Sequence, residues 1–258
     1  MSAHPAAQMV YADLAGTTTL VVGASRGIGR AIAGGLADVG SAVVGVARSG
    51  DALGDLGAEI RAGGGEFMGL ERDISDVEAI DAWVEQAWNW RGAINGLVNA
   101  AGITNRLSAL DITIGEWDHL FEVNLRGAFF LMQAVGRRML GGDGGSVVNI
   151  ASLSGVVSDG AQAAYSASKA AMIQVTSVLA NQWAPRVRLN CVSPGWVETD
   201  MTRTFLADEV NLAGVLERTP MGRVAGAEEM VGPVVFLLSG MSSFGTGQNL
   251  VVDGGWTS

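Results

Sequence analysis

Short runs of apolar and β-branched residues alternate along the chain with longer stretches in which apolar positions recur at helical spacing. The short runs predict strands at Thr17–Val22, Ala42–Ala47, Glu66–Leu70, Gly96–Asn99, Ser146–Ala151, Val187–Val192 and Asn249–Val252. The longer stretches predict helices at Gly27–Val39, Asp51–Ala62, Val77–Trp90, Glu116–Leu140, Ala161–Trp183 and Glu228–Leu238. This alternation predicts βαβ units, and therefore an α/β fold with a seven-stranded, mostly parallel, doubly wound sheet flanked by helices.

The alternation continues through almost the whole chain without a linker, an internal repeat or a low-complexity tract. We therefore expect a single domain over residues 14–258, preceded by an irregular arm at residues 1–13. One segment, at about residues 196–223, interrupts the rhythm between the sixth strand and the last long helix. An insertion at this place is typical of a lid that covers a substrate.

Composition and charge narrow the class of protein. The 258 residues are 48% hydrophobic, which excludes a disordered chain and provides an ample core. The formal charge of −10 argues against a surface for nucleic acid or for an anionic membrane, because both need clustered lysine and arginine. No apolar run reaches the ~20 residues of a membrane span, and no secretory signal is visible at the N-terminus. These features predict a soluble cytoplasmic protein.

The cysteine and histidine content excludes two further kinds of site. Cys191 is the only cysteine, so no intrachain disulfide can form. Two histidines and one cysteine, far apart in the sequence, do not make a zinc site, so we expect no metal. Because Cys191 lies in a predicted strand, we expect a buried core residue rather than a nucleophile.

The first predicted strand runs into a glycine-rich turn, with Gly23, Gly27 and Gly29 in the pattern G-x-x-x-G-x-G, and a helix follows directly. Glycine lets the backbone turn sharply and approach a ligand, because no Cβ stands in the way. The amides and the positive dipole end of the new helix favour a phosphate. A tight turn without a ligand is the alternative, but the position in the first βαβ unit favours a dinucleotide.

The end of the second predicted strand bears on which dinucleotide is bound. An acidic residue there would accept hydrogen bonds from the adenosine ribose and repel a 2′-phosphate. The chain has Ala47-Arg48-Ser49 instead, and a second arginine, Arg26, lies in the glycine turn. Guanidinium groups form bidentate, charge-assisted hydrogen bonds with phosphate. The two arginines therefore favour NADP(H) over NAD(H), with NAD(H) and a merely solvated surface role as the open alternatives.

Tyr165 and Lys169 lie four residues apart at the start of a predicted helix and so share one face. A nearby ammonium group stabilises a phenolate and lowers the phenol pKa from about 10. Such a phenol can give or take a proton at a carbonyl or alcohol oxygen. Ser152 follows a predicted parallel strand, where its hydroxyl would face the ligand crevice and bond the same oxygen. Each motif alone could equally be a surface pair or a helix cap.

In combination these motifs resemble the short-chain dehydrogenase/reductase family, in its 3-oxoacyl-reductase-like ketoreductase branch. The resemblance is carried by Gly23-x-x-x-Gly27-Ile28-Gly29, Asn99-Ala100-Ala101-Gly102, Asn124, Ser152, Tyr165-x-x-x-Lys169 and Pro194-Gly195. It covers about Leu14 to Trp256 and implies a Rossmann fold and hydride transfer between a nicotinamide and a ketone or secondary alcohol. Val22 and Ala100 stand where the family usually has Thr and Asn, outside the proton-transfer residues.

The resemblance also implies a role for each matching residue. Tyr165 would be the acid in reduction and the base in oxidation, and Ser152 would orient the substrate carbonyl. Lys169 would hold the nicotinamide ribose and lower the Tyr165 pKa, while Asn124 would hold a water that relays protons to Lys169. The residues implied to contact the cofactor are Gly23, Ser25, Arg26, Ile28, Gly29, Arg48, Ser49, Asp73, Ile74, Asn99, Ala101, Gly102, Tyr165, Lys169, Pro194, Gly195, Val197 and Thr199.

The substrate is less constrained than the reaction. The residues expected to line its site are Ser154, Trp196, Met201 and Phe205. They are mainly apolar and favour a neutral, moderately hydrophobic ketone, which makes an NADPH-dependent ketone reductase the first expectation. Arg106 lies near the predicted crevice and could instead meet a carboxylate.

Three alternatives stay open. An NAD-dependent polyol or sugar-acid dehydrogenase is disfavoured by Arg48 at the end of the second strand. A 3-oxoacyl-(acyl-carrier-protein) reductase needs a basic surface for its acidic partner, which Arg137, Arg138 and Arg186 could supply but a charge of −10 disfavours. An inactive dinucleotide sensor would be expected to lose the catalytic residues that this chain keeps.

The two longest predicted helices, Glu116–Leu140 and Ala161–Trp183, carry apolar residues on more than one face. One face covers the sheet and the other needs a partner. Together with the interface usual in the family, this predicts a homotetramer or dimer. The other expected partner is a small-molecule ketone or secondary alcohol, with no nucleic acid and no membrane.

Overall fold

Seven parallel strands form one sheet in the order β3-β2-β1-β4-β5-β6-β7, in a computed structural model that describes residues 13–158 and 162–258. The strands are β1 (Thr18–Val22), β2 (Ala42–Ala47), β3 (Phe67–Glu71), β4 (Gly96–Asn99), β5 (Gly145–Ile150), β6 (Val187–Pro194) and β7 (Asn249–Val252). Every neighbouring pair is parallel. The predicted single-domain α/β fold is confirmed, with a sheet that is parallel throughout.

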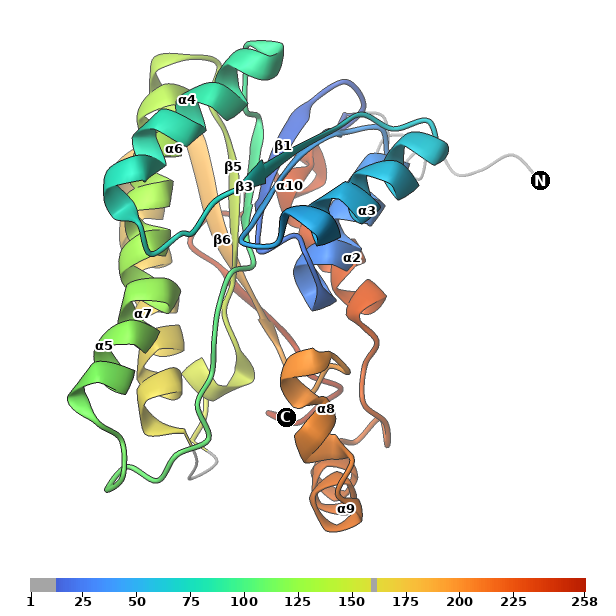
Figure 1. Cartoon of the computed structure of the whole chain (residues 1–258), viewed down its shortest axis with the longest axis vertical. Helices are drawn as coiled ribbons and strands as arrows, with labels where there is room; N and C mark the ends of the chain where they lie inside the picture. Colours follow the sequence, from blue (N-terminus) through green and yellow to red (C-terminus); the bar gives the residue numbers. More distant parts are fainter. Residues whose placement is uncertain (1–12, 159–161) are drawn as a thin grey trace.

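Helices cover both faces of the sheet (Figure 1). In that view α4 (Ile80–Arg91), α6 (Ala128–Gly141) and α7 (Ala163–Trp183) lie on one side, and α2 (Gly27–Asp38), α3 (Gly50–Ala62) and α10 (Val231–Leu238) lie on the other. Short 3-10 turns occur at η1 (Val77–Ala79), η3 (Leu153–Gly155), η4 (Ala227–Met230) and η5 (Gly240–Ser242). Within the part of the chain that the structure describes, no helix is both long and apolar enough to cross a membrane.

Each face of the sheet has its own hydrophobic core. Leu20 of β1 and Leu97 of β4 pack into one core, whereas their chain neighbours Val21 and Val98 pack into the other. Successive side chains of a strand point to opposite faces, so a strand covered on both faces needs apolar residues at every position. This is the physical reason for the continuous apolar runs from which the strands were predicted.

The sheet has its topological switch point between β1 and β4. β1 pairs with β2 on one side and with β4 on the other, so the chain leaves these strands in opposite directions. The crevice at the carboxyl ends of such strands is where ligands bind in open α/β sheets. The fold therefore places the glycine turn after β1 at the mouth of this crevice.

The glycine turn packs against the segment that follows β4. Gly23 has a positive φ of 89°, and a Cβ on it would lie 2.7 Å from the Ala101 backbone nitrogen. A Cβ on Gly29 would lie 2.2 Å from the Gly23 carbonyl oxygen. Glycine is required at both positions because no side chain fits these approaches.

The helix predicted over Glu116–Leu140 is interrupted, so this prediction of one continuous helix is wrong. α5 (Ile114–Phe121) and α6 are separated by η2 (Glu122–Gly127), a stretch of π-helix. A Cβ on Gly127 would lie 2.3 Å from the Ile74 carbonyl oxygen, so the chain passes this loop at a distance that only glycine allows. π-helical stretches are rare and occur often at functional sites, and this one carries Asn124.

The segment predicted as a lid forms two further helices, α8 (Asp200–Leu206) and α9 (Glu209–Arg218). They lie beyond the end of the sheet, next to the C-terminus, at the bottom of the view in Figure 1. Two predictions fall outside the described residues: most of the irregular arm at residues 1–13, and the start of a helix at Ala161.

Candidate active site

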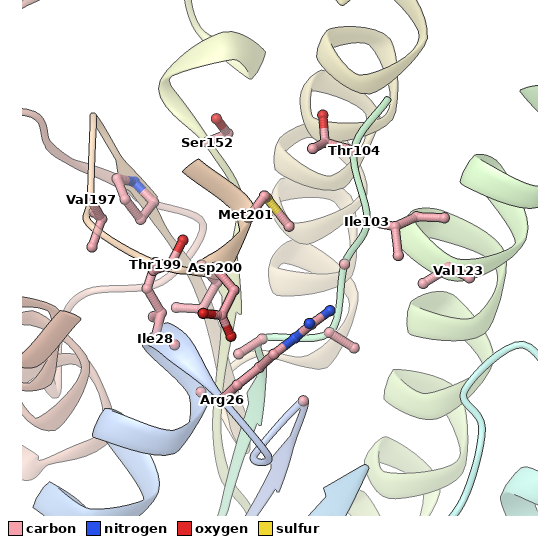
Figure 2. A pocket seen from close by; sticks show the side chains of 18 of the residues that line it. Arg26, Ile28, Ile103, Thr104, Val123, Ser152, Val197, Thr199, Asp200 and Met201 are labelled. Carbon is pink, nitrogen blue, oxygen red and sulfur yellow. The ribbon is translucent and has the colours of Figure 1, made fainter. Parts of the chain in front are cut away.

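One pocket at the carboxyl ends of the strands collects most of the residues predicted from the sequence. Those that line it are Gly23, Ser25, Arg26, Ile28, Gly29, Arg48, Asp73, Ile74, Ala101, Gly102, Ser152, Ser154, Tyr165, Lys169, Pro194, Gly195, Trp196, Val197, Thr199 and Met201. Figure 2 shows Val197 and Thr199 on one side of the pocket, Ile103 and Val123 on the other, and Arg26 reaching in from the glycine turn. The pocket is thus continuous from the glycine turn to Tyr165.

Four predicted residues do not line the pocket, and their side chains contact other parts of the chain instead. The Ser49 hydroxyl accepts a hydrogen bond from the Ala52 amide at 3.4 Å and caps α3. Asn99 is buried, and its amide donates to Asn149 Oδ1 at 3.4 Å. Phe205 stacks on Trp196, and the Asn124 side chain accepts a hydrogen bond from the Ile103 amide; Trp196 and Ile103 both line the pocket. The direct cofactor contacts expected of Ser49 and Asn99 stay predictions.

At one end of the pocket Arg48 faces Asp73, with 3.9 Å between Arg48 Nη1 and Asp73 Oδ2. The backbone amide and the hydroxyl of Ser75 both donate to Asp73 Oδ1, at 2.9 and 2.8 Å. Partial burial raises the pKa of Asp73, but these hydrogen bonds and the charge of Arg48 outweigh it and hold the pKa below its usual value. Asp73 is therefore a carboxylate at neutral pH, able to accept a hydrogen bond from an adenosine.

At the other end Tyr165 and Ser152 share a side-chain hydrogen bond. Ser152 is at the end of β5, where its hydroxyl also accepts from the Ser154 amide at 3.2 Å. Burial raises the pKa of Tyr165, and the hydrogen bond to Ser152 and the charge of Arg106 lower it only in part. The pKa of Tyr165 is therefore raised, where the sequence predicted a lowered value, and the groups that lower it in part are Ser152 and Arg106 rather than Lys169. The phenol is protonated at neutral pH and suits an acid that protonates a carbonyl oxygen.

Lys169 is 5% exposed, and its Nζ donates to the Ile150 carbonyl oxygen at 2.9 Å. Burial lowers the pKa of Lys169 to about 8, and the nearby thiol of Cys191 opposes this shift. Nζ lies 5.8 Å from the centroid of the Tyr165 ring. Lys169 thus lies beside the phenol, on the floor of the pocket, as the sequence predicted.

The Asn124 amide connects the π-helical stretch to the pocket wall. Its Oδ1 accepts from the Ile103 amide at 2.8 Å, and its Nδ2 donates to the Ile103 carbonyl at 2.9 Å and to Ser168 Oγ at 3.1 Å. A Cβ on Gly102 would lie 3.3 Å from Lys169 Nζ and 3.5 Å from Asn124 Oδ1. Asn124 therefore fixes the loop beside Lys169.

The substrate side contains residues that the motifs did not reveal. Thr104 and Gln162 line the pocket, and the Thr104 hydroxyl donates to the Gln162 side-chain oxygen. Gln162 has a φ of 55°, which is uncommon for a residue with a side chain and points to a functional constraint. Gln162 ends the segment after Ser152, residues 154–162, whose side chains the sequence places next to the substrate. Arg72 and Asp200 also line the pocket.

Arg106 enters this side of the pocket above two aromatic rings. Its Cζ lies 4.1 Å from the centroid of Phe205 and 5.5 Å from that of Trp196. The two rings stack on each other, with 4.9 Å between centroids and 13° between planes. Stacking of this kind holds a guanidinium in a fixed place.

The residues present fit a nicotinamide dinucleotide. The glycine turn forms a backbone cradle that a Cβ at Gly23 or Gly29 would obstruct, and the pocket extends from there to Tyr165. A bound nicotinamide would supply the hydride. Tyr165 would exchange the proton at the substrate oxygen, with Ser152 bonded to the same oxygen. Within residues 13–158 and 162–258 no group of His, Cys, Asp or Glu is placed to hold a metal.

The chain is similar to known proteins over nearly its whole length. A family model described as enoyl-(acyl carrier protein) reductase matches residues 23–257. The chain is 34% identical to 2-dehydro-3-deoxy-D-gluconate 5-dehydrogenase of Dickeya dadantii over 248 residues, which are 95% of this chain and 96% of the relative. It is 39% identical to 3-oxoacyl-(acyl-carrier-protein) reductase of Escherichia coli over 241 residues, 93% of this chain and 97% of the relative.

A solved structure shows the same similarity in three dimensions. The crystal structure of a gluconate 5-dehydrogenase from Burkholderia cenocepacia, in complex with NADP and tartrate, matches with a TM-score of 0.93 and 33% identity, covering 97% of this chain and 98% of that one. The region matched by the family model contains the glycine turn, Ser152, Tyr165 and Lys169. The chain therefore belongs to the short-chain dehydrogenase/reductase family and is an NAD(P)-dependent oxidoreductase of secondary alcohols and ketones.

Proposed function

We propose that the protein uses NADP(H) to interconvert a small polar hydroxy acid and the corresponding keto acid. The observation that carries this proposal is Arg106, whose guanidinium lies in the pocket over Phe205, at the end that holds Tyr165 and Ser152. A guanidinium recognises a carboxylate through two parallel hydrogen bonds. A neutral hydrophobic ketone, the first expectation from the sequence, would make no use of this charge beside the reacting oxygen.

Relatives support an acid substrate. Two of the similar proteins named above are dehydrogenases of gluconate or a gluconate derivative, and the crystal structure also holds tartrate, a hydroxy acid. Thr104 and Gln162 add a hydroxyl and an amide to the same side of the pocket. These groups suit a substrate that carries several hydroxyls.

Replacing Arg106 by alanine is expected to raise KM for gluconate about 10- to 100-fold, because a lost hydrogen bond to a charged group is worth roughly 1.5–3 kcal/mol. KM for a neutral secondary alcohol in the same oxidation assay should change little. The Arg106→Lys variant keeps the charge and should retain part of the affinity. Steady-state kinetics of oxidation with a panel of hydroxy acids and neutral secondary alcohols measures this, and a wild-type kcat/KM that is higher for the neutral alcohols would refute the acid assignment.

The preference for NADP(H) is supported by the two arginines at the cofactor end. Arg26 and Arg48 both line the pocket, and the last residue of β2 is Ala47 rather than an acid. Arg48 is already near Asp73, a contact of 3.9 Å between exposed groups, so a bound phosphate can draw it away at small cost. The related gluconate 5-dehydrogenase structure contains NADP.

A double variant, Ala47→Asp with Arg48→Ala, is expected to raise KM for NADPH about 10- to 100-fold, since it removes one charge-assisted contact and adds a repelling carboxylate. KM for NADH should stay the same or fall. Arg91→Ala is the matched control, because Arg91 pairs with Glu66 at 2.6 Å and does not line the pocket. A wild-type kcat/KM for NADH at or above that for NADPH would show that the cofactor preference is wrong.

A 3-oxoacyl-(acyl-carrier-protein) reductase is the second candidate, favoured by the 39% identity to that enzyme of Escherichia coli. Two of the arginines suggested for its acidic partner make contacts within the chain. Arg138 pairs with Asp81 at 2.7 Å, and Arg186 donates to the Gly142 carbonyl oxygen. These contacts favour the small acid over a carrier protein.

We further propose that α8 and α9 form the lid over about residues 196–223, and that the protein acts in the cytoplasm as a homotetramer or dimer. The half-exposed apolar side chains Phe130 of α6 and Val178 of α7, at 38% and 44% exposure, support an interface on these helices. Met201, which lines the pocket from α8, supports the lid.

A further inference from the structure

Five side chains from separate segments form a continuous column that runs from the pocket to the C-terminus. In order they are Arg106, Phe205, Trp196, Trp256 and Arg218. We call this set the aromatic column. We propose that Trp256 and Arg218, which do not line the pocket, are positioning residues that hold Trp196, Phe205 and Arg106 in place and so set the affinity for the substrate.

The contacts along the column are those of attractive ring interactions. Trp196 and Trp256 have centroids 6.4 Å apart and planes tilted by 48°, within the range of favourable aromatic pairs. Arg218 Cζ lies 4.3 Å from the Trp256 centroid, which matches the 4.1 Å between Arg106 Cζ and Phe205 at the other end. A guanidinium therefore lies over the ring at each end of the aromatic column.

Trp256 is held in the column by packing and not by a hydrogen bond. Its Nε1 is buried without a hydrogen-bond partner among the described residues. The turn that carries it is fixed by Asp253, whose carboxylate accepts from the amides of Gly255 and Thr257, each at 2.9 Å. The position of the indole is thus set by this turn and by the neighbouring rings.

The same turn joins the column to the lid helices. The Met221 amide, just after α9, donates to the Gly254 carbonyl oxygen at 3.1 Å. Arg218 is the last residue of α9, and Phe205 lies in α8. Trp256 therefore contacts, directly or through one ring, both lid helices and the segment that lines the pocket. A change at Trp256 has a route to Arg106 that does not pass through Tyr165, Ser152 or Lys169.

The test compares Trp256→Ala, Trp256→Phe and Arg218→Ala with the wild type. Trp256→Ala is expected to raise KM for gluconate about tenfold, which corresponds to ~1.4 kcal/mol, and to leave kcat and KM for NADP⁺ unchanged. Trp256→Phe keeps a ring and should restore most of the affinity. Arg218→Ala should give a smaller rise, about two- to fivefold, as expected for one cation–π contact at an exposed site.

A second measurement does not depend on the substrate. In the NADP⁺-bound enzyme, backbone amides of Asp200–Leu206 and Glu209–Arg218 should exchange hydrogen faster in Trp256→Ala than in the wild type, and those of Gly50–Ala62 should not. Trp117→Ala is the matched control, because Trp117 stacks on Phe121 at 4.7 Å and lies outside the column. It should alter neither KM nor lid exchange.

The outcomes separate this inference from the proposed function, on which it rests only for the choice of gluconate. If the wild-type kcat/KM is higher for the neutral alcohols of the panel than for the hydroxy acids, the acid assignment fails, and KM is measured with the panel alcohol of highest wild-type kcat/KM. Unchanged exchange in α8 and α9 of Trp256→Ala would overturn the column as a support of the lid. The positioning role would be overturned if Trp256→Ala showed faster exchange in α8 and α9 but kept the wild-type KM for the substrate. It would also be overturned if Trp256→Ala lowered kcat by the same factor by which it raised KM, and Trp256→Phe did not restore the affinity.

Discussion

Replacing Tyr165 by phenylalanine is expected to lower kcat by about 10²- to 10⁴-fold, the usual contribution of a general acid or base. The ring stays in its partly buried position and only the hydroxyl bonded to Ser152 is lost. Affinity for NADPH and the melting temperature should therefore remain near their wild-type values. Steady-state kinetics, fluorescence titration with NADPH and thermal unfolding measure the three quantities.

Tyr11→Phe is the matched control for this change, because the chain has only two tyrosines. It should leave kcat unchanged. A Tyr165→Phe variant that keeps more than about a tenth of wild-type kcat would mean that another group exchanges the proton, since a general acid–base group contributes at least about 10²-fold. The raised pKa of Tyr165 also predicts how the rates of reduction and oxidation depend on pH. Reduction, which needs the protonated phenol, should be favoured at neutral pH, and oxidation should accelerate as the pH rises.

Replacing Lys169 by methionine is expected to change how stability depends on pH. The folded protein holds the pKa of Lys169 at about 8, below the usual value of 10.5. Between these values the unfolded chain carries a proton that the folded protein does not, so unfolding becomes less favourable as the pH rises. The full difference corresponds to about 3 kcal/mol. The wild type should therefore gain stability over Lys169→Met from pH 8 upward.

Urea unfolding of both proteins at pH 7.5, 8.5 and 9.5 measures this difference. Tyr165 and Cys191 have raised pKa values and stay neutral in the fold over this range, so they affect both proteins alike. Parallel stability curves would contradict the assignment. Since Lys169 lines the pocket, the variant should also bind NADPH more weakly. Cys191→Ser, at a buried position outside the pocket, should keep the rise in stability between pH 7.5 and 8.5, below the range in which the unfolded thiol ionises.

Most of the fold could be predicted because its signals are local. A strand covered on both faces is apolar at every position, as β1 and β2 are, and this property is visible in the sequence alone. The pocket residues could be predicted from the sequence for a similar reason. Gly23 and Gly29 lie in turns where no Cβ fits, and such positions leave a spacing of glycines that can be recognised.

The rest depends on contacts between distant segments, which no local pattern contains. The π-helical stretch at Glu122–Gly127 arises where Gly127 passes the Ile74 carbonyl. The raised pKa of Tyr165 comes from burial by the whole fold, which outweighs the lowering by the hydrogen bond to Ser152 and by the charge of Arg106. Arg106 was expected only near the crevice, and its place over Phe205 depends on how α8 packs.

The two ends of the pocket differ in how freely their residues can be exchanged, and this has a consequence for evolution and engineering. Around the cofactor end, the backbone at Gly23 and Gly29 approaches other backbone atoms so closely that even a methyl group has no room. The substrate end is built from long side chains, such as Arg106, Met201 and Gln162, on loops and a short helix. Natural drift or a directed library can therefore alter substrate choice at these positions while the dinucleotide cradle is inherited unchanged.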